Sequence, residues 1–357
     1  MVARGCALRD SALQLGMRSF AFALLLGIAC GSGGASISRG APPPAPPAES
    51  SGSPPPVSLR STAAAPPRPA GAEPTALTIG GGAIEVAIED GRLDVSRAEL
   101  LAWISNAARA VTAYFGRFPV AHYRIVIEPV EGRSGVLGGT TWSYGGAHSR
   151  IHVGEHTTVA ELDRDWVMTH EMVHTAFPQQ ERSHHWIEEG MATYVEPLAR
   201  SWVGRYPVAR VWTDLVDGLP NGLPRRGDRG LDHTHTWGRT YWGGALFCLL
   251  ADLEIRERTG GRRGLVDALR GILAAGGNDQ VEWPVERAFR EGDKAIGVPV
   301  LEELYQRMKD APVSPDLDAL WHGLGVEVRQ GTLQLDDQAP KAAMRHAISA
   351  PPAPATP

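Results

Sequence analysis

The sequence predicts an α+β fold in which a small mixed sheet precedes a mainly helical part. Segments with alternating polar and apolar residues lie mostly before residue 155, whereas after about residue 235 apolar residues recur mainly at helical spacing. Strands grouped in one part of a chain and helices in another are typical of the α+β class.

The sheet is expected from the first half of the chain. Residues 83–89 and 123–128 alternate as strands do, and the intervening residues 95–115 carry an apolar stripe at the spacing of a helix. Residues 138–153 contain a glycine pair on each side of a short β-like run, followed by a second such run. This arrangement predicts a hairpin with glycine-containing turns, and its first strand is expected at the edge of the sheet.

A helix is expected from about residue 159 to residue 177. Thr158 and Glu161 have the capping-box spacing, apolar residues recur through the segment, and Pro178 marks its end. Four further helices are predicted, and the weakly alternating residues 326–335 are predicted as a strand. The four helical ranges are 239–258, 262–275, 299–309 and 315–323.

Residues 1–30 have the pattern of a signal peptide. An apolar run over 20–29 follows Arg18 and is too short to span a bilayer comfortably. Translation from Met17 would give a more compact signal than translation from the first Met. The run ends at Cys30 in a context that resembles the lipobox of bacterial lipoproteins. We therefore expect an exported protein, either tethered to the cell envelope through a lipidated Cys30 or secreted after ordinary signal cleavage.

The remaining sequence divides into a linker, a body and a tail. Residues 31–75 are rich in Pro, Ala, Ser and Gly and are expected to form a disordered tether. Residues 76–349 are expected to form the folded body, with an α/β part over 76–180 and a mainly helical part over 181–349. Residues 350–357 are expected to be a disordered tail.

Charge and cysteine content exclude two classes of protein. The formal net charge is −5, and residues 1–75 hold six Arg and three acidic residues, so the rest of the chain carries a net −8. An acidic body without a basic stripe argues against nucleic acid as a partner. Cys248 is the one Cys of the body, which excludes a disulfide-built fold and a thiolate zinc site. Its apolar surroundings predict a buried thiol.

A metal site is predicted by residues 170–174, which read HEMVH and contain the HExxH pattern. Residues four apart share one face of a helix, so His170 and His174 can bind the same Zn²⁺. Glu171, beside the first ligand, can act as the catalytic base. The neighbouring residues are mostly apolar, and polar side chains inside a buried helix need partners, which a metal ion would provide.

The third ligand is indicated by a resemblance further along the chain. Residues 186–194 read WIEEGMATY and resemble the W-x-x-E-G-x-A segment of gluzincin metallopeptidases of the aminopeptidase N and glycyl aminopeptidase type. The resemblance implies a thermolysin-like catalytic domain, one Zn²⁺ per chain and Glu189 as the third ligand, with Glu188 as the alternative. Thr193, one turn later, could support a ligand His. Two imidazoles and one carboxylate suit zinc best among divalent ions.

A second segment adds to this resemblance. Residues 239–245 resemble the Y-x-K-G segment of these families, which implies that the Tyr241 hydroxyl stabilises the oxyanion of the tetrahedral intermediate. Gly243 stands where the family has Lys, and an aromatic residue in the core is the alternative interpretation of Tyr241. The link between His174 and Glu189 is fourteen residues long, shorter than in aminopeptidase N.

The G-x-M-E-N segment with which aminopeptidase N holds the free amine of its substrate does not occur in this sequence. Residues 138–146 precede the zinc helix instead, and an edge strand there could pair with an extended peptide. The sequence therefore leaves open whether the substrate is cut at its N-terminus or internally.

Four other histidines lie near these motifs. His184 and His185 lie between the two ligand segments, where they are interpreted as loop or helix-start residues. His233 and His235 precede Tyr241, where surface positions are favoured over positions in the substrate cleft.

The sequence thus predicts a zinc metallopeptidase that acts on a peptide or protein. Two alternatives stay open at this point. One is a non-catalytic binding lipoprotein of the cell envelope on a peptidase-like scaffold, and the other is a metal-dependent hydrolase of a non-peptide amide or ester. An intact Glu171 argues against the first of these.

Overall fold

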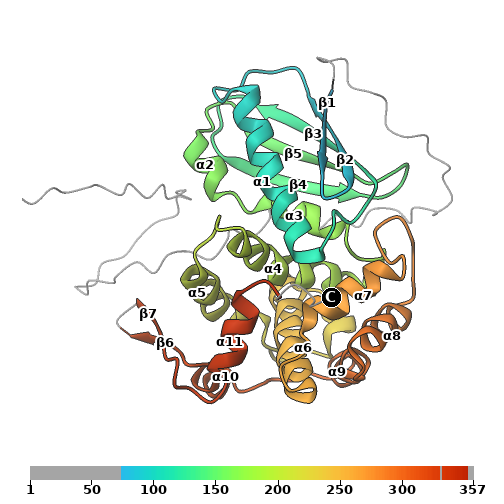
Figure 1. Ribbon diagram of the computed structural model, residues 1–357, viewed down its shortest axis with the longest axis vertical. Coiled ribbons are helices and arrows are strands. Elements are labelled where there is room, and N and C mark those ends of the chain that lie inside the picture. The colour runs from blue at the N-terminus through green and yellow to red at the C-terminus, as the bar shows by residue number, and fades with distance from the viewer. Residues whose placement is uncertain (1–73, 330–331, 353–357) are drawn as a thin grey trace, which may run out of the picture. The chain divides into compact units, whose positions relative to one another are not determined.

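The computed structural model describes residues 74–329 and 332–352, so the predicted signal peptide, Cys30, the linker up to residue 73 and the tail from residue 353 lie outside it. Within these ranges, five strands form one mixed sheet with the order β1-β2-β3-β5-β4 (Figure 1). β2, β3 and β5 are parallel, whereas β1 and β4 pair antiparallel at the two edges. The strands are β1 (Thr75–Ile79), β2 (Gly82–Ile88), β3 (His122–Val130), β4 (Val136–Trp142) and β5 (His148–Gly154).

β4 and β5 form the predicted hairpin, and β4 lies at the edge of the sheet as expected. Gly145 and Gly146 form the turn with φ angles of 71° and 108°, which side chains other than glycine rarely tolerate. The register places Thr141 directly opposite Ser149. β4 is therefore hydrogen-bonded to a neighbouring strand on one side only, and its other edge is open, as the sequence predicts.

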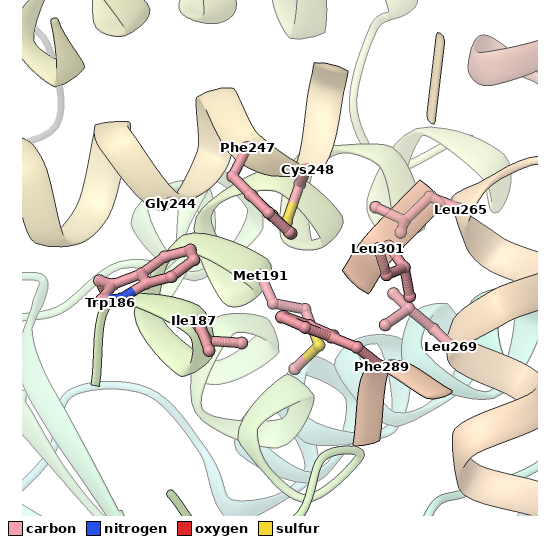
Figure 2. Close-up of a pocket in the computed structure, with 10 residues that line it drawn as sticks. All are labelled: Trp186, Ile187, Met191, Gly244, Phe247, Cys248, Leu265, Leu269, Phe289 and Leu301. Carbon is pink, nitrogen blue, oxygen red and sulfur yellow. The ribbon is translucent and has the colours of Figure 1, made fainter. Parts of the chain in front are cut away.

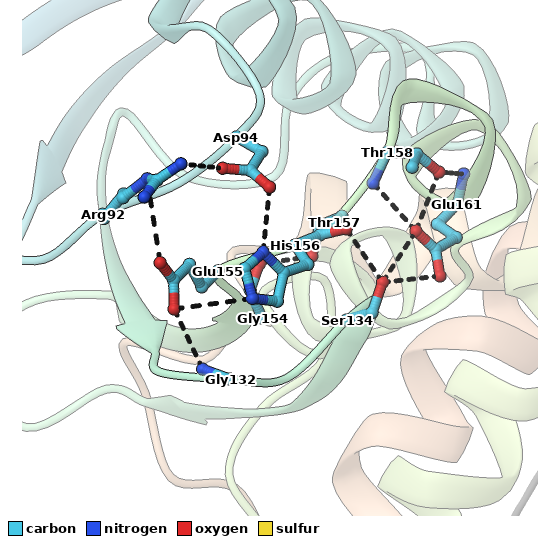
Figure 3. Close-up of polar contacts among 10 residues, drawn as sticks. All are labelled: Arg92, Asp94, Gly132, Ser134, Gly154, Glu155, His156, Thr157, Thr158 and Glu161. Atoms are coloured by element: carbon cyan, nitrogen blue, oxygen red, sulfur yellow. Dashed lines mark hydrogen bonds and ion pairs between the residues drawn. The ribbon is translucent and has the colours of Figure 1, made fainter.

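Polar contacts fix the loop that leads from β3 into β4 (Figure 3). The backbone N–H of Gly132 donates to Glu155 Oε2 at 3.0 Å, and Arg92 Nε lies 3.7 Å from the other oxygen of Glu155. The Ser134 hydroxyl donates to Glu161 Oε1 at 2.9 Å. The entry into β4 is thereby tied both to the turn that follows β5 and to the helix after it.

The helix α1 (Arg97–Phe115) packs on the sheet and on the helices of the metal site. Ser96 and Glu99 form a capping box at its N-terminus, and Gly116 ends it with a φ of 79°. Its apolar stripe is buried, as the spacing predicts. The other face of the sheet carries half-exposed ion pairs, such as Arg150 with Glu128 at 2.8 Å.

The single helix predicted for residues 159–177 is wrong, because the chain breaks it into α2 (Val159–Arg164) and α3 (Val167–His174). Asp165 is extended, and its carboxylate accepts from the backbone N–H groups of Val167 and Met168 at 2.9 and 3.0 Å. Asp165 therefore satisfies two of the free N–H groups with which α3 begins. The break gives the HExxH segment a helix of its own.

The rest of the described chain is mainly helical, as predicted (Figure 1). None of the helices in residues 74–329 and 332–352 combines the length and apolar character needed to cross a membrane. The helices are α4 (His185–Trp202), α5 (Val208–Gly218), α6 (Gly244–Thr259), α7 (Leu265–Ala274), α8 (Val285–Ile296), α9 (Val300–Met308), α10 (Leu317–Leu324) and α11 (Ala342–Ser349).

Two segments of the helical part differ from the prediction. The helix expected over 239–258 begins as a π-helical turn, Gly238–Gly243, and only then continues as α6. The strand expected over 326–335 is a hairpin of two strands, β6 (Val326–Arg329) and β7 (Thr332–Leu335).

The helices α4 and α6 cross at two glycines. A Cβ atom on Gly190 would lie 2.2 Å from the Cα of Gly244, and a Cβ atom on Gly244 would lie 2.1 Å from the carbonyl oxygen of Trp186. Only glycine at both positions allows the backbones to approach this closely. The crossing sets the position of α4 and of Glu189, which directly precedes Gly190.

Beside this crossing lies a small apolar cavity (Figure 2). Side chains from α4, α6, α7, α8 and α9 converge on it, and the buried thiol of Cys248 is among them, as the sequence predicts. The free volume is about 20 Å³, roughly the space of one water molecule, but the lining offers water almost no polar partner. The cavity is therefore a packing defect of the core.

The last described helix, α11, closes over the ends of earlier helices. The indole N–H of Trp202 donates to the carbonyl of Ile348 at 3.2 Å, and that of Trp212 donates to the hydroxyl of Ser349 at 2.9 Å. Arg256 donates to the carbonyl of Ala347 at 3.3 Å. The C-terminal part of α4 is thus held by the last described segment of the chain.

Asp279, in the connection between α7 and α8, is a buried carboxylate that should make stability depend on pH. It is 5% exposed, and neither of its oxygens accepts a hydrogen bond of normal geometry. Burial raises the pKa of Asp279 to about 7, and the nearby Gln280 side chain opposes the rise only in part. The folded protein therefore binds this proton more tightly than the unfolded chain does, and stability falls as the pH rises from about 4 to about 7.

We expect Asp279→Asn to raise the melting temperature at pH 8 by several degrees. At pH 8 the buried charge of Asp279 destabilises the folded protein, and the substitution removes this destabilisation. It amounts to at most about 4 kcal/mol, because the pKa of Asp279 is displaced by about three pH units. The difference from wild type should shrink as the pH falls and vanish near pH 2, well below the ordinary pKa of 3.8, where the wild-type carboxyl is protonated in both states. Thermal unfolding across this range checks the expectation, with the exposed Asp90→Asn as control. Equal curves for wild type and Asp279→Asn at pH 8 would contradict it.

Candidate metal centre

Three side chains converge where α3 faces the start of α4. His170 and His174 lie one turn apart on α3, and Glu189 comes from α4. The Nε2 atoms of the two imidazoles lie 3.1 and 3.7 Å from Glu189 Oε2. One ligand atom from each residue lies within 4.8 Å of the others, which makes this trio a group that could hold a metal ion.

The charges of the trio suit a cation. Burial lowers the pKa of His174 to about 4, so this imidazole is neutral with a free lone pair. Burial also opposes ionisation of Glu189, but contacts with His174, His170 and His185 outweigh it and hold the pKa of Glu189 well below its usual range. Burial would likewise lower the pKa of His170, but the hydrogen bond to Glu189 raises it. His170 Nε2 and Glu189 Oε2, 3.1 Å apart, are among the atoms that would surround a divalent cation here.

The donor set fits Zn²⁺. Two imidazole nitrogens and one carboxylate oxygen are a common ligand set of catalytic zinc, and they leave the fourth position open. The helix α3 is buried from Val167 to Val173, as its apolar neighbours predict, so solvent gives these polar side chains little compensation. A bound metal ion would provide the partner that these side chains need.

Glu171 lies beside the trio, against the edge strand. The Thr141 hydroxyl donates to Glu171 Oε2 at 2.7 Å. Burial raises the pKa of Glu171 to about 7. Gly139 packs against the same side chain, and a Cβ atom there would lie 2.7 Å from Glu171 Cγ. A carboxylate with a raised pKa is suited to accept and release a proton near neutral pH.

Tyr241 lies next to His170. The two rings are stacked, with centroids 6.3 Å apart and an angle of 19° between their planes. Trp237 stacks on Tyr241 at 6.1 Å. Tyr241 is half-buried and packs against the hydrophobic core at its edge, so both interpretations of this residue stay open here. The π-helical turn carries it, and the sequence resemblance had indicated the residue but not this local structure.

Glu188, the alternative third ligand, and Thr193, the expected support for a ligand His, both lie in α4. Glu188 lies 3.4 Å from His185 Nδ1 and is not part of the trio. Thr193 donates to the carbonyl oxygen of Glu189 at 2.8 Å, within its own helix, so the expectation that it supports a ligand His is wrong.

His185 has a contact that the sequence interpretation missed. It begins α4, as expected of a helix-start residue, but its Nε2 lies 3.2 Å from Glu189 Oε1. The spacing of four residues between His185 and Glu189 was the available signal, since such residues share one helix face.

The other histidines lie apart from the trio. His184 is hydrogen-bonded to Tyr305 at 3.1 Å and lies 3.4 Å from Asp232. His233 pairs with Asp310 at 2.7 Å in an exposed position, and His235 is exposed.

Comparison with known proteins gives relatives by structure alone. No family model matches the sequence, and no curated protein matches it. An aminopeptidase N family protein from Idiomarina loihiensis is similar over 72% of this chain and 49% of its own, with 14% identity and a TM-score of 0.55. An M1 zinc metallopeptidase from Deinococcus radiodurans is similar over 69% of this chain and 53% of its own, with 16% identity and a TM-score of 0.45.

The chain spans about half the length of the structures it resembles. At 14% identity, the likeness to the Idiomarina protein shows a common fold, a mixed α/β arrangement like that of an aminopeptidase N family protein.

Proposed function

We propose that this chain is a zinc-dependent metallopeptidase with a thermolysin-like, gluzincin-type catalytic domain. The observation that carries the proposal is the convergence of His170, His174 and Glu189 at metal-binding distance, with Glu171 beside them. His170, His174 and Glu189 would hold the ion. Bound Zn²⁺ would supply a Lewis acid that polarises the scissile carbonyl and lowers the pKa of water.

The protein side chains then have separate tasks. Glu171 takes the proton of the attacking water and passes it to the leaving amine. Its Oε2 already accepts from Thr141, so Oε1 is the oxygen left for this transfer. Tyr241, beside His170, donates its hydroxyl proton as a hydrogen bond to the carbonyl oxygen as negative charge develops there.

The substrate that we propose is an extended peptide. β4 pairs with β5 on one side only, so its other edge can add a peptide strand through backbone hydrogen bonds. Residues 136–142 contain no acidic side chain that could hold a free amine. This feature favours internal cleavage over removal of N-terminal residues.

The alternatives lose ground on specific grounds. A non-catalytic scaffold has no use for a buried Glu171 with its own hydrogen-bond donor. A hydrolase of a non-peptide amide or ester would use the same residues, and the free edge of β4 is the feature that favours a peptide. We also propose export to the cell envelope, with Cys30 as the point of lipidation.

Metal content tests the proposal first. The purified protein and His170→Ala are incubated with zinc, dialysed and analysed by mass spectrometry. We expect about one zinc per chain in the wild type and none in the variant. Peptide libraries are then screened for internal cleavage. A folded wild type that binds no zinc would overturn the proposal, and a zinc protein that cleaves no peptide but hydrolyses an ester would move the second alternative to first place.

His185 should strengthen metal binding through Glu189. Its contact with Oε1 orients the carboxylate so that Oε2 faces the two imidazoles. We expect His185→Ala to weaken zinc affinity about 10-fold, which is the usual effect of removing a residue that orients a ligand. Competition with a chelator measures this effect.

The control for His185→Ala is His152→Ala. His152 is also half-exposed and paired with a Glu, at 3.4 Å from Glu128, but it lies on the outer face of the sheet. The substitution His152→Ala should therefore leave zinc affinity unchanged. Equal affinities for His185→Ala and wild type would show that Glu189 needs no such support.

A further inference from the structure

A chain of hydroxyl groups runs through the sheet to Glu171. The Tyr123 hydroxyl on β3 is hydrogen-bonded to the Ser149 hydroxyl on β5. Ser149 Oγ lies 2.6 Å from Thr141 Oγ1 on β4, and Thr141 Oγ1 lies 2.7 Å from Glu171 Oε2. Three neighbouring strands thus each contribute one hydroxyl, and the chain ends on the proposed base.

The direction of these hydrogen bonds follows from the number of protons. In the ionised form that a base requires, the Glu171 carboxylate only accepts, so the single hydroxyl proton of Thr141 then points to Glu171. The Glu171 carbonyl oxygen, 3.0 Å away, competes for this proton, but a charged acceptor is the stronger one. Ser149 must then donate to Thr141, and Tyr123 must donate to Ser149. All three protons are oriented toward the carboxylate.

Burial makes this order rigid. Ser149 is 0% exposed and Tyr123 is 2% exposed, so water does not offer these hydroxyls other partners. Hydrogen bonds in such surroundings strengthen one another. On the same strand, Gly139 leaves just enough room for Glu171 Cγ. β4 therefore limits the position of Glu171 both by contact and by a hydrogen bond.

We propose that Thr141 is a positioning residue for the catalytic base. It holds Oε2 of Glu171, so that Oε1 is the oxygen available for the proton transfer. This inference rests on the proposed function, in which Glu171 moves the proton. A purely structural role, in which Thr141 only ties β4 to α3 through the backbone carbonyl of Glu171, predicts a loss of stability without movement of the carboxylate.

The test compares Thr141→Val with Thr141→Ser. Valine keeps the shape and removes the hydroxyl, and serine restores the hydroxyl. The matched control is Thr78→Val, an exposed threonine of β1 at the opposite edge of the sheet. With a peptide substrate, we expect Thr141→Val to lower kcat about 10- to 100-fold with KM and zinc content unchanged, because small displacements of a catalytic group have effects of this size. Thr141→Ser should restore kcat to within about threefold of the wild-type value.

A second readout does not depend on activity. Crystal structures of the metal-free wild type, Thr141→Val and Thr141→Ser show where the Glu171 carboxylate lies. We expect it displaced in Thr141→Val alone. If Thr141→Val does not fold, Tyr123→Phe, which removes the first donor and keeps the ring, takes its place.

The outcomes separate the two proposals. An unmoved Glu171 in Thr141→Val, or kcat within twofold of wild type, overturns the positioning role. A zinc-loaded wild type that hydrolyses nothing overturns the proposed function, and the crystal comparison then still decides whether Thr141 positions Glu171.

Discussion

Replacement of Glu171 by Gln should abolish hydrolysis and leave the metal in place. The amide has nearly the shape of the carboxylate and can still accept from Thr141, but it cannot take a proton from water. We expect activity to fall by about 10³-fold, within the range that general bases contribute, with one zinc per chain retained. Activity and zinc content are measured on the same preparation.

Two further Glu→Gln variants serve as controls for the metal site. Glu189→Gln should lose zinc, because it removes the charged ligand, and Glu188→Gln should retain it, because Glu188 pairs with His185 outside the trio. The opposite result for these neighbours would reassign the third ligand. Full activity in Glu171→Gln would exclude the proposed mechanism even if zinc is bound.

Replacement of Gly190 by Ala should cause the largest loss of stability. The added methyl group would lie 2.2 Å from the Cα atom of Gly244, and backbone atoms cannot move aside as a side chain can. Overpacking usually costs about 1–3 kcal/mol, and contact with backbone places this variant at or above the upper end. Denaturant unfolding of the metal-free protein measures the effect.

The matched control is Gly323→Ala in α10. A Cβ atom there would meet only Lys341 Cδ at 3.7 Å, an ordinary contact. Since alanine favours helix more than glycine does, this variant should be neutral or more stable by up to about 1 kcal/mol. If both variants unfold at the same denaturant concentration, α4 and α6 do not cross as described.

The sequence predicted those elements whose pattern is local. α1, α7 and α9 bury the stripes that their spacing indicates, and β2 and β3 are strands where they are expected. α8 was missed, in part because Gly292 interrupts it. That glycine lies where a Cβ atom would be 2.7 Å from Leu301 Cδ1, so it serves packing against α9 and does not end the helix.

The break before α3 could not be predicted either. Asp165 is compatible with a helix interior, and whether its carboxylate caps the next turn depends on the backbone around it. α5, α11 and β1 were also missed.

For the metal site, sequence reasoning succeeded where spacing fixes geometry and failed where tertiary contact does. His170 and His174 are one helical turn apart in any helix, so their proximity follows from the motif. The Thr141–Glu171 contact forms only because β4 packs against α3, so no local sequence pattern predicts it. Glu189 came from family resemblance, since the path between the two helices is not encoded in a short motif.

The position of α11 has a consequence for biosynthesis. Trp202, at the end of the helix that carries Glu189, finds its partner in Ile348, 146 residues later. A ribosome delivers the chain from its N-terminus, so α4 must wait for most of the body to be made before this contact can form. The final packing of the helix that carries Glu189 is therefore completed only when the C-terminal part of the body has been synthesised.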